Sequence, residues 1–191
     1  MKKKIIIIII VLIILTITGL LILNLKNNNN TKLDTDKKVL TLYFSMSGNT
    51  ETVAKYINKN IGGEIIKIET DKTYPTNYNE LTNIAKEEKD KKERPSLKTK
   101  IDINNYDTIF LGYPIWYSDM PMAIYTLLDE YDFSNKTIIP FATHGGSGLS
   151  NTPNKIQQLE PNAKVLEGLE IRGNEAKNSE KEIINYINKI N

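Results

Sequence analysis

Short apolar runs alternate with longer amphipathic ones from residue 38 to the end of the chain. The apolar runs predict buried strands at Lys38–Phe44, Glu64–Glu69, Thr108–Gly112, Thr137–Ala142 and Lys164–Leu169. The amphipathic runs predict helices at Asn49–Asn60, Asn77–Glu93, Met120–Tyr131, Asn151–Leu159 and Ser179–Lys189. Five strands that are each followed by a helix predict an α/β fold, with a doubly wound parallel sheet and helices on both faces.

The N-terminus follows a different pattern. In Ile5–Leu23, 16 of 19 residues are Ile, Leu or Val. A helix of this length is about 28 Å long, close to the ~30 Å hydrocarbon core of a bilayer. The segment is longer than the ~7–15 apolar residues of a signal peptide, and no small-residue cleavage site follows it. We therefore expect residues 1–23 to be an uncleaved transmembrane anchor; cleavage would instead give a secreted protein.

Three lysines at positions 2–4 predict that the N-terminus stays in the cytoplasm. The protein would then cross the cell membrane once and place the rest of the chain outside the cytoplasm. Residues 24–36 are polar and aperiodic, which is typical of a flexible linker. Residues 37–191 have the length of one domain.

Charge and composition exclude several classes of function. All 23 acidic residues follow residue 32, whereas five basic residues precede residue 33. Residues 33–191 therefore carry 20 basic and 23 acidic residues, a net charge of −3, and we expect no binding of nucleic acid. The chain has no cysteine and one histidine, which excludes disulfides and thiol catalysis, and we expect no metal site.

The loop between the first predicted strand and helix combines small polar residues with an absence of charge. It reads "SMSGNT", residues 45–50, and the first basic residue after it is Lys55. A helix N-terminus offers unpaired N–H groups and the positive end of its dipole, which together bind phosphate. The lysine of a Walker A loop and the three glycines of a dinucleotide fingerprint are both missing. The loop predicts a site for one phosphate; a helix cap formed by Ser47 or Asn49 is the alternative.

Two further loops follow the third and fourth predicted strands. "YPIWYSDMP" lies between prolines and presents Trp116 and Tyr117, an aromatic pair suited to the face of a flat ring. Trp116 covering the core is the alternative. "ATHGGSGLSNT" has glycines that let backbone N–H groups approach a ligand, and no G-x-S-x-G elbow accompanies it, which excludes an esterase. Ligands bind beyond the carboxyl ends of parallel strands, so the three loops predict one site.

Together the three loops resemble those of the flavodoxin family, especially its small members, through "YFSMSGNT" and "GYPIWY". The resemblance covers Lys38 to about Gly173 and implies a five-stranded parallel sheet of order 2-1-3-4-5 with non-covalently bound FMN. It implies that the FMN phosphate is bound by a loop consisting of Ser45, Met46, Ser47, Gly48, Asn49 and Thr50. It implies that the isoalloxazine is lined by Pro114, Ile115, Trp116 and Tyr117, and that its pyrimidine edge faces Thr143, His144, Gly145, Gly146 and Ser147.

Two points stay open on the sequence alone. His144 near the pyrimidine edge would stabilise the anionic reduced flavin if its imidazole were protonated, and would do so less if neutral. "YPTNY", Tyr74–Tyr78, has the alternatives of closing over the flavin or of packing its own loop.

The resemblance implies a redox flavoprotein that carries electrons between a membrane donor or a redox partner protein and an acceptor. No residue is needed as a catalytic acid, base or nucleophile, because FMN supplies the chemistry. The first alternative is an FMN-dependent NAD(P)H:quinone-type oxidoreductase on the same fold. The second is a binding module that has kept the fold and lost the cofactor.

Overall fold

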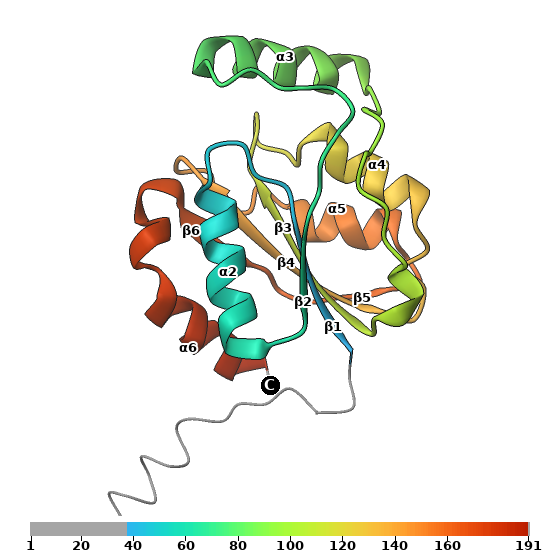
Figure 1. Ribbon diagram of the computed structural model, residues 1–191, viewed down its shortest axis with the longest axis vertical. Helices are drawn as coiled ribbons and strands as arrows, with labels where there is room; N and C mark the ends of the chain where they lie inside the picture. Colours follow the sequence, from blue (N-terminus) through green and yellow to red (C-terminus); the bar gives the residue numbers. More distant parts are fainter. Residues whose placement is uncertain (1–37, 191) are drawn as a thin grey trace, which may run out of the picture. The chain divides into compact units, whose positions relative to one another are not determined.

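A parallel β-sheet runs through the centre of the domain (Figure 1). The computed structural model describes residues 38–190, so the predicted anchor (1–23) and linker (24–36) lie outside the described residues. The strands are β1 (Val39–Tyr43), β2 (Glu64–Lys67), β3 (Thr108–Pro114), β4 (Thr137–His144), β5 (Lys164–Val165) and β6 (Leu169–Arg172). They follow the order β2-β1-β3-β4-β5, and β6 also pairs with β4. The predicted fold class and strand order are confirmed.

The fifth position of the sheet differs from its prediction. The sequence predicts one strand, Lys164–Leu169, whereas the structure has two short strands, β5 and β6, both parallel to β4. Ile138 pairs with Val165 and Phe141 pairs with Leu169, so three steps along β4 correspond to four along the edge. One extra residue therefore bulges out. The carboxyl end of this edge lies three residues further along the chain than predicted, at Arg172, because β6 pairs with β4 as far as His144.

Pro140, in the middle of β4, accounts for the interruption. The Leu166 amide donates to the carbonyl oxygen of Ile138 at 2.9 Å, so the even-numbered residues of β4 face the β5–β6 edge. Pro140 faces the same edge and has no N–H to donate, which interrupts the ladder. A Cβ at Gly168 would lie 2.9 Å from the Pro140 carbonyl oxygen, so the bulge needs glycine there.

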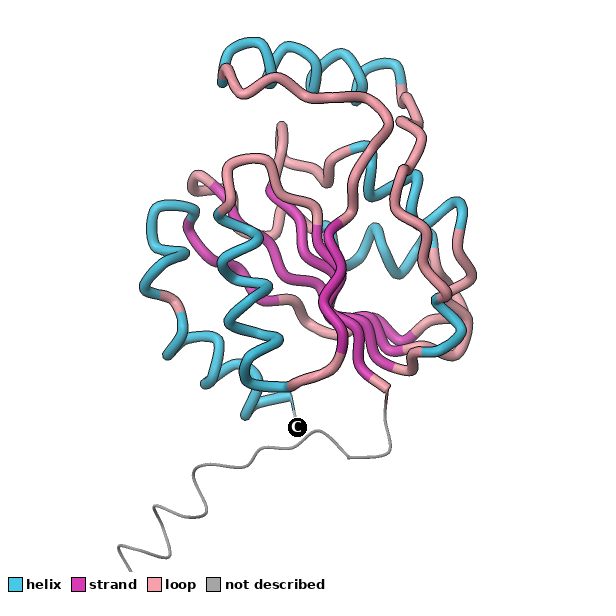
Figure 2. The backbone as a smooth tube through the Cα atoms, in the orientation of Figure 1, coloured by secondary structure: helices cyan, strands magenta, loops and turns pink. Residues whose placement is uncertain are grey.

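Helices cover both faces of the sheet, as predicted (Figures 1 and 2). One cluster of buried residues joins the sheet to α2 and α6, and a second joins it to α4 and α5. Leu40 belongs to one cluster and its neighbour Val39 to the other, because successive strand side chains point to opposite faces. The helices are α2 (Asn49–Ile61), α3 (Tyr78–Lys91), α4 (Met122–Glu130), α5 (Thr152–Leu159) and α6 (Glu180–Ile190), with 3₁₀ helices η1 (Ile103–Asn105) and η2 (Gly173–Asn178). Within residues 38–190, none of the helices combines the length and apolarity needed to cross a bilayer.

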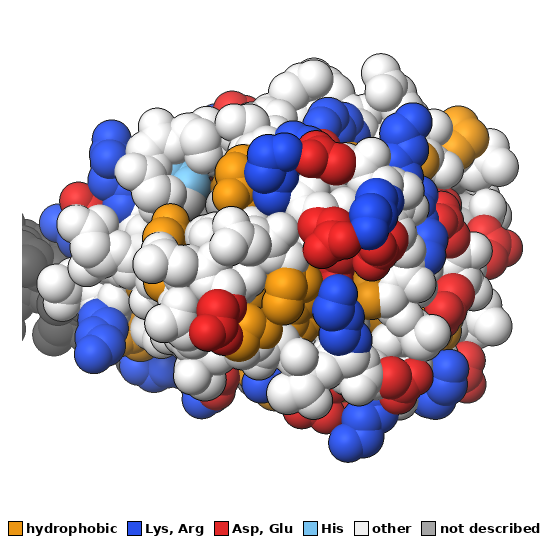
Figure 3. All heavy atoms as spheres, turned by 90° about the horizontal axis from the view of Figure 1, so that it is seen from above, with side chains coloured by type: hydrophobic (Ala, Val, Ile, Leu, Met, Phe, Trp, Pro, Cys, Tyr) orange, Lys and Arg blue, Asp and Glu red, His pale blue; other side chains and the backbone are white. Residues whose placement is uncertain are grey.

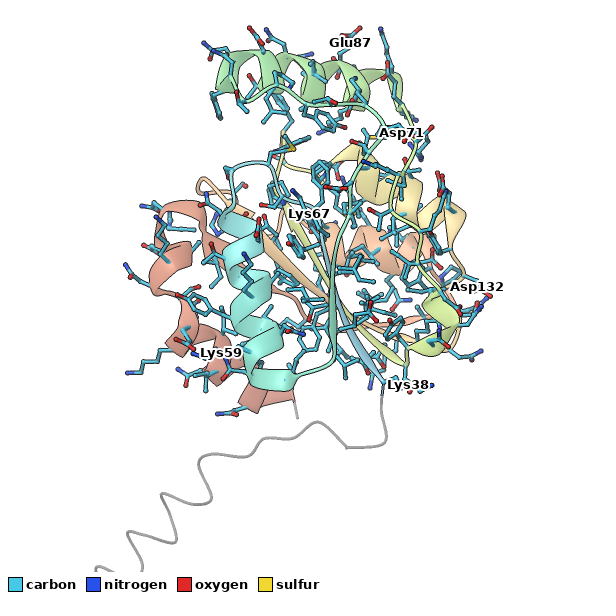
Figure 4. The ribbon with its side chains drawn as sticks, viewed as in Figure 1. Lys38, Lys59, Lys67, Asp71, Glu87 and Asp132 are labelled. Atoms are coloured by element: carbon cyan, nitrogen blue, oxygen red, sulfur yellow. The ribbon has the colours of Figure 1, made fainter. Side chains whose placement is uncertain are left out.

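The third helix, α3, does not lie flat against the sheet. It crosses beyond the carboxyl ends of the strands (Figures 1 and 2), and of its residues Ala85 and Glu88 are buried. Its charged run "KEEKDKKER" forms the solvent-facing ion pairs Lys86–Asp90 and Lys91–Glu87, as expected for a solvated helix surface. Glu87 lies on the side of α3 that faces away from the sheet (Figure 4).

Candidate functional site

A cavity of about 770 Å³ opens between α3 and the carboxyl ends of the strands. This volume is within the ~300–1,000 Å³ range of small-molecule sites. Acidic and basic side chains are mixed on this end of the molecule (Figure 3). The lining residues come from five segments and are Ser47, Asn49, Tyr78, Leu81, Thr82, Ala85, Pro114, Ile115, Trp116, Tyr117, Thr143, His144, Gly145, Arg172, Gly173 and Asn174.

The N-terminus of α2 forms one end of the site. Gly48 has a φ of +85°, a left-handed conformation that favours glycine, and turns the chain into α2. No side chain caps the helix, so the helix cap considered from the sequence is not formed by Ser47 or Asn49. Ser45 is 5% exposed, and its Oγ has no hydrogen-bond partner within residues 38–190. A buried polar group without a partner costs about 1–3 kcal/mol. Both features favour a ligand rich in hydrogen-bond acceptors at this helix end.

The first and third loops are joined by a buried contact. The hydroxyl oxygens of Thr50 and Thr143 lie 2.8 Å apart and share a hydrogen bond. Of the predicted phosphate loop, Ser47 and Asn49 line the cavity, whereas Ser45, Met46, Gly48 and Thr50 are not among the lining residues. Their role as FMN ligands stays a prediction.

The loop after β3 forms a tight turn, residues 116–119, which we call the aromatic hairpin. Trp116 and Asp119 form its bridge through backbone hydrogen bonds of 2.9 and 3.0 Å. The two central residues, Tyr117 and Ser118, have φ angles of +49° and +58°, as in a type I′ turn. Such conformations cost about 1 kcal/mol or more for a residue other than glycine. The rim of the cavity therefore contains strained backbone, and Tyr117 at its tip is 46% exposed.

Asp119 attaches the aromatic hairpin to the body of the domain. Its Oδ1 accepts hydrogen bonds from the Met120 amide and the Tyr125 hydroxyl, both at 2.9 Å. Its Oδ2 lies 2.7 Å from the Lys155 ammonium nitrogen. Burial, followed by the hydrogen bond to Asp119, raises the pKa of Tyr125, so this phenol remains a donor. Three partners on one buried carboxylate hold the hairpin in a defined position.

An aromatic cluster lies behind Trp116. The rings of Phe44, Tyr74 and Trp116 meet edge to face, with centroids 5.6 to 5.8 Å apart. The Tyr74 hydroxyl donates to Glu88 of α3 at 2.9 Å, and the Lys72 ammonium donates to the other carboxylate oxygen at 2.7 Å. Burial raises the pKa of Tyr74, and the charge of Glu88 adds to this. Trp116 thus packs against the core, as one of the two alternatives from the sequence has it, and it also lines the cavity; its contact with a flat ring stays a prediction.

The two tyrosines of the segment Tyr74–Tyr78 lie in different environments, and its closure over a flavin stays a prediction. Tyr74 is 6% exposed and packs in the aromatic cluster. Tyr78 begins α3, is 76% exposed and lines the cavity. The first tyrosine therefore supports the loop, and the second lies at the cavity mouth.

His144 ends β4 and is 8% exposed. Its Nδ1 accepts backbone hydrogen bonds from Gly146 at 3.0 Å and Gly148 at 3.2 Å. Nδ1 is therefore occupied as a hydrogen-bond acceptor, and Nε2 is left as the donor of the ring. The role of His144 beside a flavin stays a prediction. Gly145 lines the cavity next to His144, whereas Gly146 and Ser147 do not.

The structure adds two groups of lining residues that sequence reasoning did not identify. One group, Leu81, Thr82 and Ala85, follows Tyr78 on α3, where the spacing of Leu81 and Ala85 marks a common face but does not reveal what that face covers. The other group follows the edge of the sheet and consists of Arg172, Gly173 and Asn174. No signal pointed to this second group, because the predicted strand ended at Leu169.

A parallel sheet of order 2-1-3-4-5 with such loops at its carboxyl edge defines a protein of flavodoxin-like fold. The family model described as Flavodoxin matches residues 38–190, and the chain belongs to the flavodoxin family. A candidate flavoprotein from Bacteroides eggerthii has 30% identity and a TM-score of 0.72, over 81% of this chain and 98% of its own. The flavoprotein of Lactobacillus acidophilus in complex with FMN has 26% identity and a TM-score of 0.62, over 74% of this chain and 97% of its own.

A flavodoxin of Haemophilus influenzae is 31% identical over 100 residues. The match includes 50% of this chain and 44% of that relative, so the chain spans less than half the length of this curated relative.

The residues at the cavity fit the parts of FMN. The uncapped end of α2 and the unpartnered Ser45 hydroxyl suit a phosphate. The aromatic hairpin offers apolar ring surface, and His144 lines the same cavity with Nδ1 already used as an acceptor, which leaves Nε2 to donate. A cavity that combines apolar walls with a few placed polar groups is typical of a cofactor site.

Proposed function

We propose that this protein binds FMN without a covalent bond and acts as an electron carrier held at the membrane. The observation that carries the proposal is that one cavity joins an uncapped helix N-terminus to an aromatic hairpin. The relative from Lactobacillus acidophilus in complex with FMN, at 26% identity, supports the same ligand.

The residues divide into three roles. The loop of residues 45–50 would bind the phosphate through backbone N–H groups and hydroxyls, with Ser45 as the buried donor. Trp116 and Tyr117 would cover one face of the ring, and His144 would donate from Nε2 toward its polar edge. When bound, FMN supplies the electron transfer, while the protein sets its orientation, its exposure and its potential. The α3 residues on the cavity wall would limit access of water to the ring.

The apolar segment Ile5–Leu23 would anchor the domain on the extracytoplasmic side of the membrane, with the N-terminus in the cytoplasm. The thirteen linker residues reach at most ~45 Å, so the flavin would stay near a membrane-bound donor or a docked redox partner. Protease treatment of intact expressing cells tests this arrangement. The arrangement is supported if the protease digests the domain and if the intact chain of untreated cells is recovered in the membrane fraction. It is contradicted if the chain is found only in the soluble cytosolic fraction.

The cofactor is tested by titrating the apoprotein, as the full chain in detergent micelles, with FMN and with riboflavin. We expect flavin fluorescence to be quenched at micromolar concentrations, and Ser45→Ala to weaken FMN binding about tenfold while riboflavin binding changes little. Thr41→Val is the matched control, because the Thr41 hydroxyl is also buried without a partner but lies inside β1. Unquenched fluorescence in the wild type would refute FMN binding. Anaerobic bleaching of the flavin by NADPH alone would favour the oxidoreductase alternative over the carrier.

A further inference from the structure

One charged residue lines the cavity in the part of the chain that the structure describes, and it is Arg172. The other lining residues are apolar or uncharged polar residues, together with His144, whose Nδ1 accepts backbone hydrogen bonds. The phosphate loop itself contains no lysine or arginine. The positive charge at the cavity wall therefore comes from Arg172, which lies more than a hundred positions after the phosphate loop in the sequence.

The Arg172 guanidinium has no recorded ion pair or hydrogen bond within residues 38–190. Glu170, two residues earlier on the same outward face of β6, is directed at Gly148, where a Cβ would lie 2.4 Å from its Oε2. A cation without a carboxylate partner at the wall of a cavity can neutralise charge on whatever binds there.

The residue after Arg172, Gly173, lies against Asn49 of the phosphate loop, whereas the Arg172 side chain itself lies at the third loop. Arg172 pairs in register with His144 at the end of β4, and its Nη1 would lie 3.7 Å from a Cβ built on Gly146. The guanidinium therefore lies against the third loop, the loop expected to face the pyrimidine edge of the flavin. The phosphate end already has the free N–H groups of α2 and the Ser45 hydroxyl.

We propose that Arg172 is the positioning residue that stabilises the negative charge of the reduced flavin, which raises the midpoint potential. The inference rests on the proposed binding of FMN. Reduction adds two electrons from the donor and one proton at N5, and leaves one negative charge on the N1–C2 carbonyl edge. Arginine stays protonated, so the Arg172 guanidinium at the cavity wall is the group that balances this charge. Glu170 is the nearest opposing charge on the same strand.

The test is potentiometric titration of the FMN-loaded full chain in detergent, with dithionite as the reductant. We expect Arg172→Gln to weaken binding of the reduced flavin about tenfold relative to the oxidised flavin, a fall in potential of about 30 mV for a two-electron couple. Arg172→Lys should recover part of the difference. Lys164→Gln is the matched control, because it removes one positive charge from the amino end of the same sheet edge and should leave the potential unchanged.

Two results would overturn the inference. An unchanged potential in Arg172→Gln would exclude the role. Loss of FMN affinity without loss of riboflavin affinity, at an unchanged potential, would assign Arg172 to the phosphate instead. Wild-type protein that binds no FMN would overturn the proposed function as well, so the two failures are distinguishable.

Discussion

The helices α2 and α3 both line the cavity, but they are attached to the domain in different ways. One side of α2 lies against the sheet and buries Thr50, Val53, Ala54 and Ile57. By contrast, α3 crosses beyond the strands and buries Ala85 and Glu88, while Leu81 and Ile84 are partly covered. Apolar burial contributes about 25 cal/mol per Å², so α2 has much the larger share of hydrophobic stabilisation.

Polar contacts provide most of the specific attachment of α3. Its Glu88 binds Lys72 and Tyr74, which both lie in the segment that precedes the helix. Its Lys89 donates to the backbone carbonyl of Tyr117 in the aromatic hairpin and lies 3.9 Å from Asp119. Exposed ion pairs contribute roughly 0–1 kcal/mol.

Because α2 and α3 are attached differently, we expect the two ends of the site to differ in local stability. Segments with few buried apolar contacts open at lower free energy than the core. We therefore expect the end at α2 to be rigid until the whole domain unfolds, and α3 to open locally. The proposed phosphate site would then be preorganised, whereas access to the proposed ring site would depend on α3.

The largest expected effect is in α2. Ile57 is 1% exposed, and Ile57→Ala should lower the free energy of unfolding by about 3 kcal/mol through loss of burial and formation of a cavity. Leu81→Ala in α3 should cost less than about 1 kcal/mol, because Leu81 is only partly buried. Urea denaturation followed by circular dichroism measures both. Equal costs would show that α3 unfolds with the core and would remove the contrast.

The next effect concerns the buried carboxylate of α3. Glu88→Gln keeps the side-chain volume but removes the charge that Lys72 and Tyr74 contact, and should cost about 1–2 kcal/mol. Because these contacts attach α3 locally, native-state hydrogen exchange of α3 amides should accelerate about tenfold while the α2 amides change little. Glu87→Gln, the exposed neighbour, is the control. Uniform acceleration in both helices would show that Glu88 stabilises the whole domain instead.

A smaller effect is the pH dependence of stability that comes from Glu160, the residue after α5. Burial, followed by the charges of Asp132 and Asp129, raises the pKa of Glu160 to about 7 from 4.5. The folded state therefore holds a proton that the unfolded state releases, and stability that is full below pH 4.5 falls as the pH rises through 7. With allowance for solvent screening the loss is about 1 kcal/mol.

Glu160→Gln should abolish this fall. The pKa values of Glu51, Glu87 and Asp132 are lowered, so these groups reduce stability as the pH falls, and they do so below the pH range in which Glu160 titrates. Asp132 lies far from α3 (Figure 4), so the exchange of α3 amides should not follow the same pH dependence. The test is the free energy of unfolding of the wild type and of Glu160→Gln, measured from pH 4 to 8. If both fall in parallel, Glu160 is not the group responsible.

The smallest effect is at the aromatic hairpin. Ser118→Gly relieves a left-handed conformation at φ +58° and should raise stability by about 0.5 kcal/mol, or Tm by roughly 1–2 °C. Ser96 has no such conformation, so Ser96→Gly should lower Tm slightly. Differential scanning calorimetry measures both changes. A lower Tm in Ser118→Gly would show that the turn is not strained.

Local patterns were sufficient for the order of elements and for three of the segments at the cavity. Apolar runs predicted the strands, and the small polar loop before α2 indicated an anion site, because N–H groups and dipole are properties of any helix end. The pair Trp116 and Tyr117 was identified from "GYPIWY" because prolines and aromatic residues restrict a loop through their own covalent geometry.

Tertiary structure alone decided what reaches the cavity from elsewhere. Arg172 lies there because β6 continues the edge and pairs with β4 as far as His144, an effect of pairing between distant strands. The use of His144 Nδ1 as an acceptor depends on two backbone amides of a folded loop, and the cover over the cavity depends on where α3 crosses. The sequence by itself determined which segments are strands and helices, since those follow from contacts between near neighbours, and it predicted the three loops as one ligand site. The charge of the site and the attachment of its cover were decided by the fold, since both depend on residues that only long-range packing brings together.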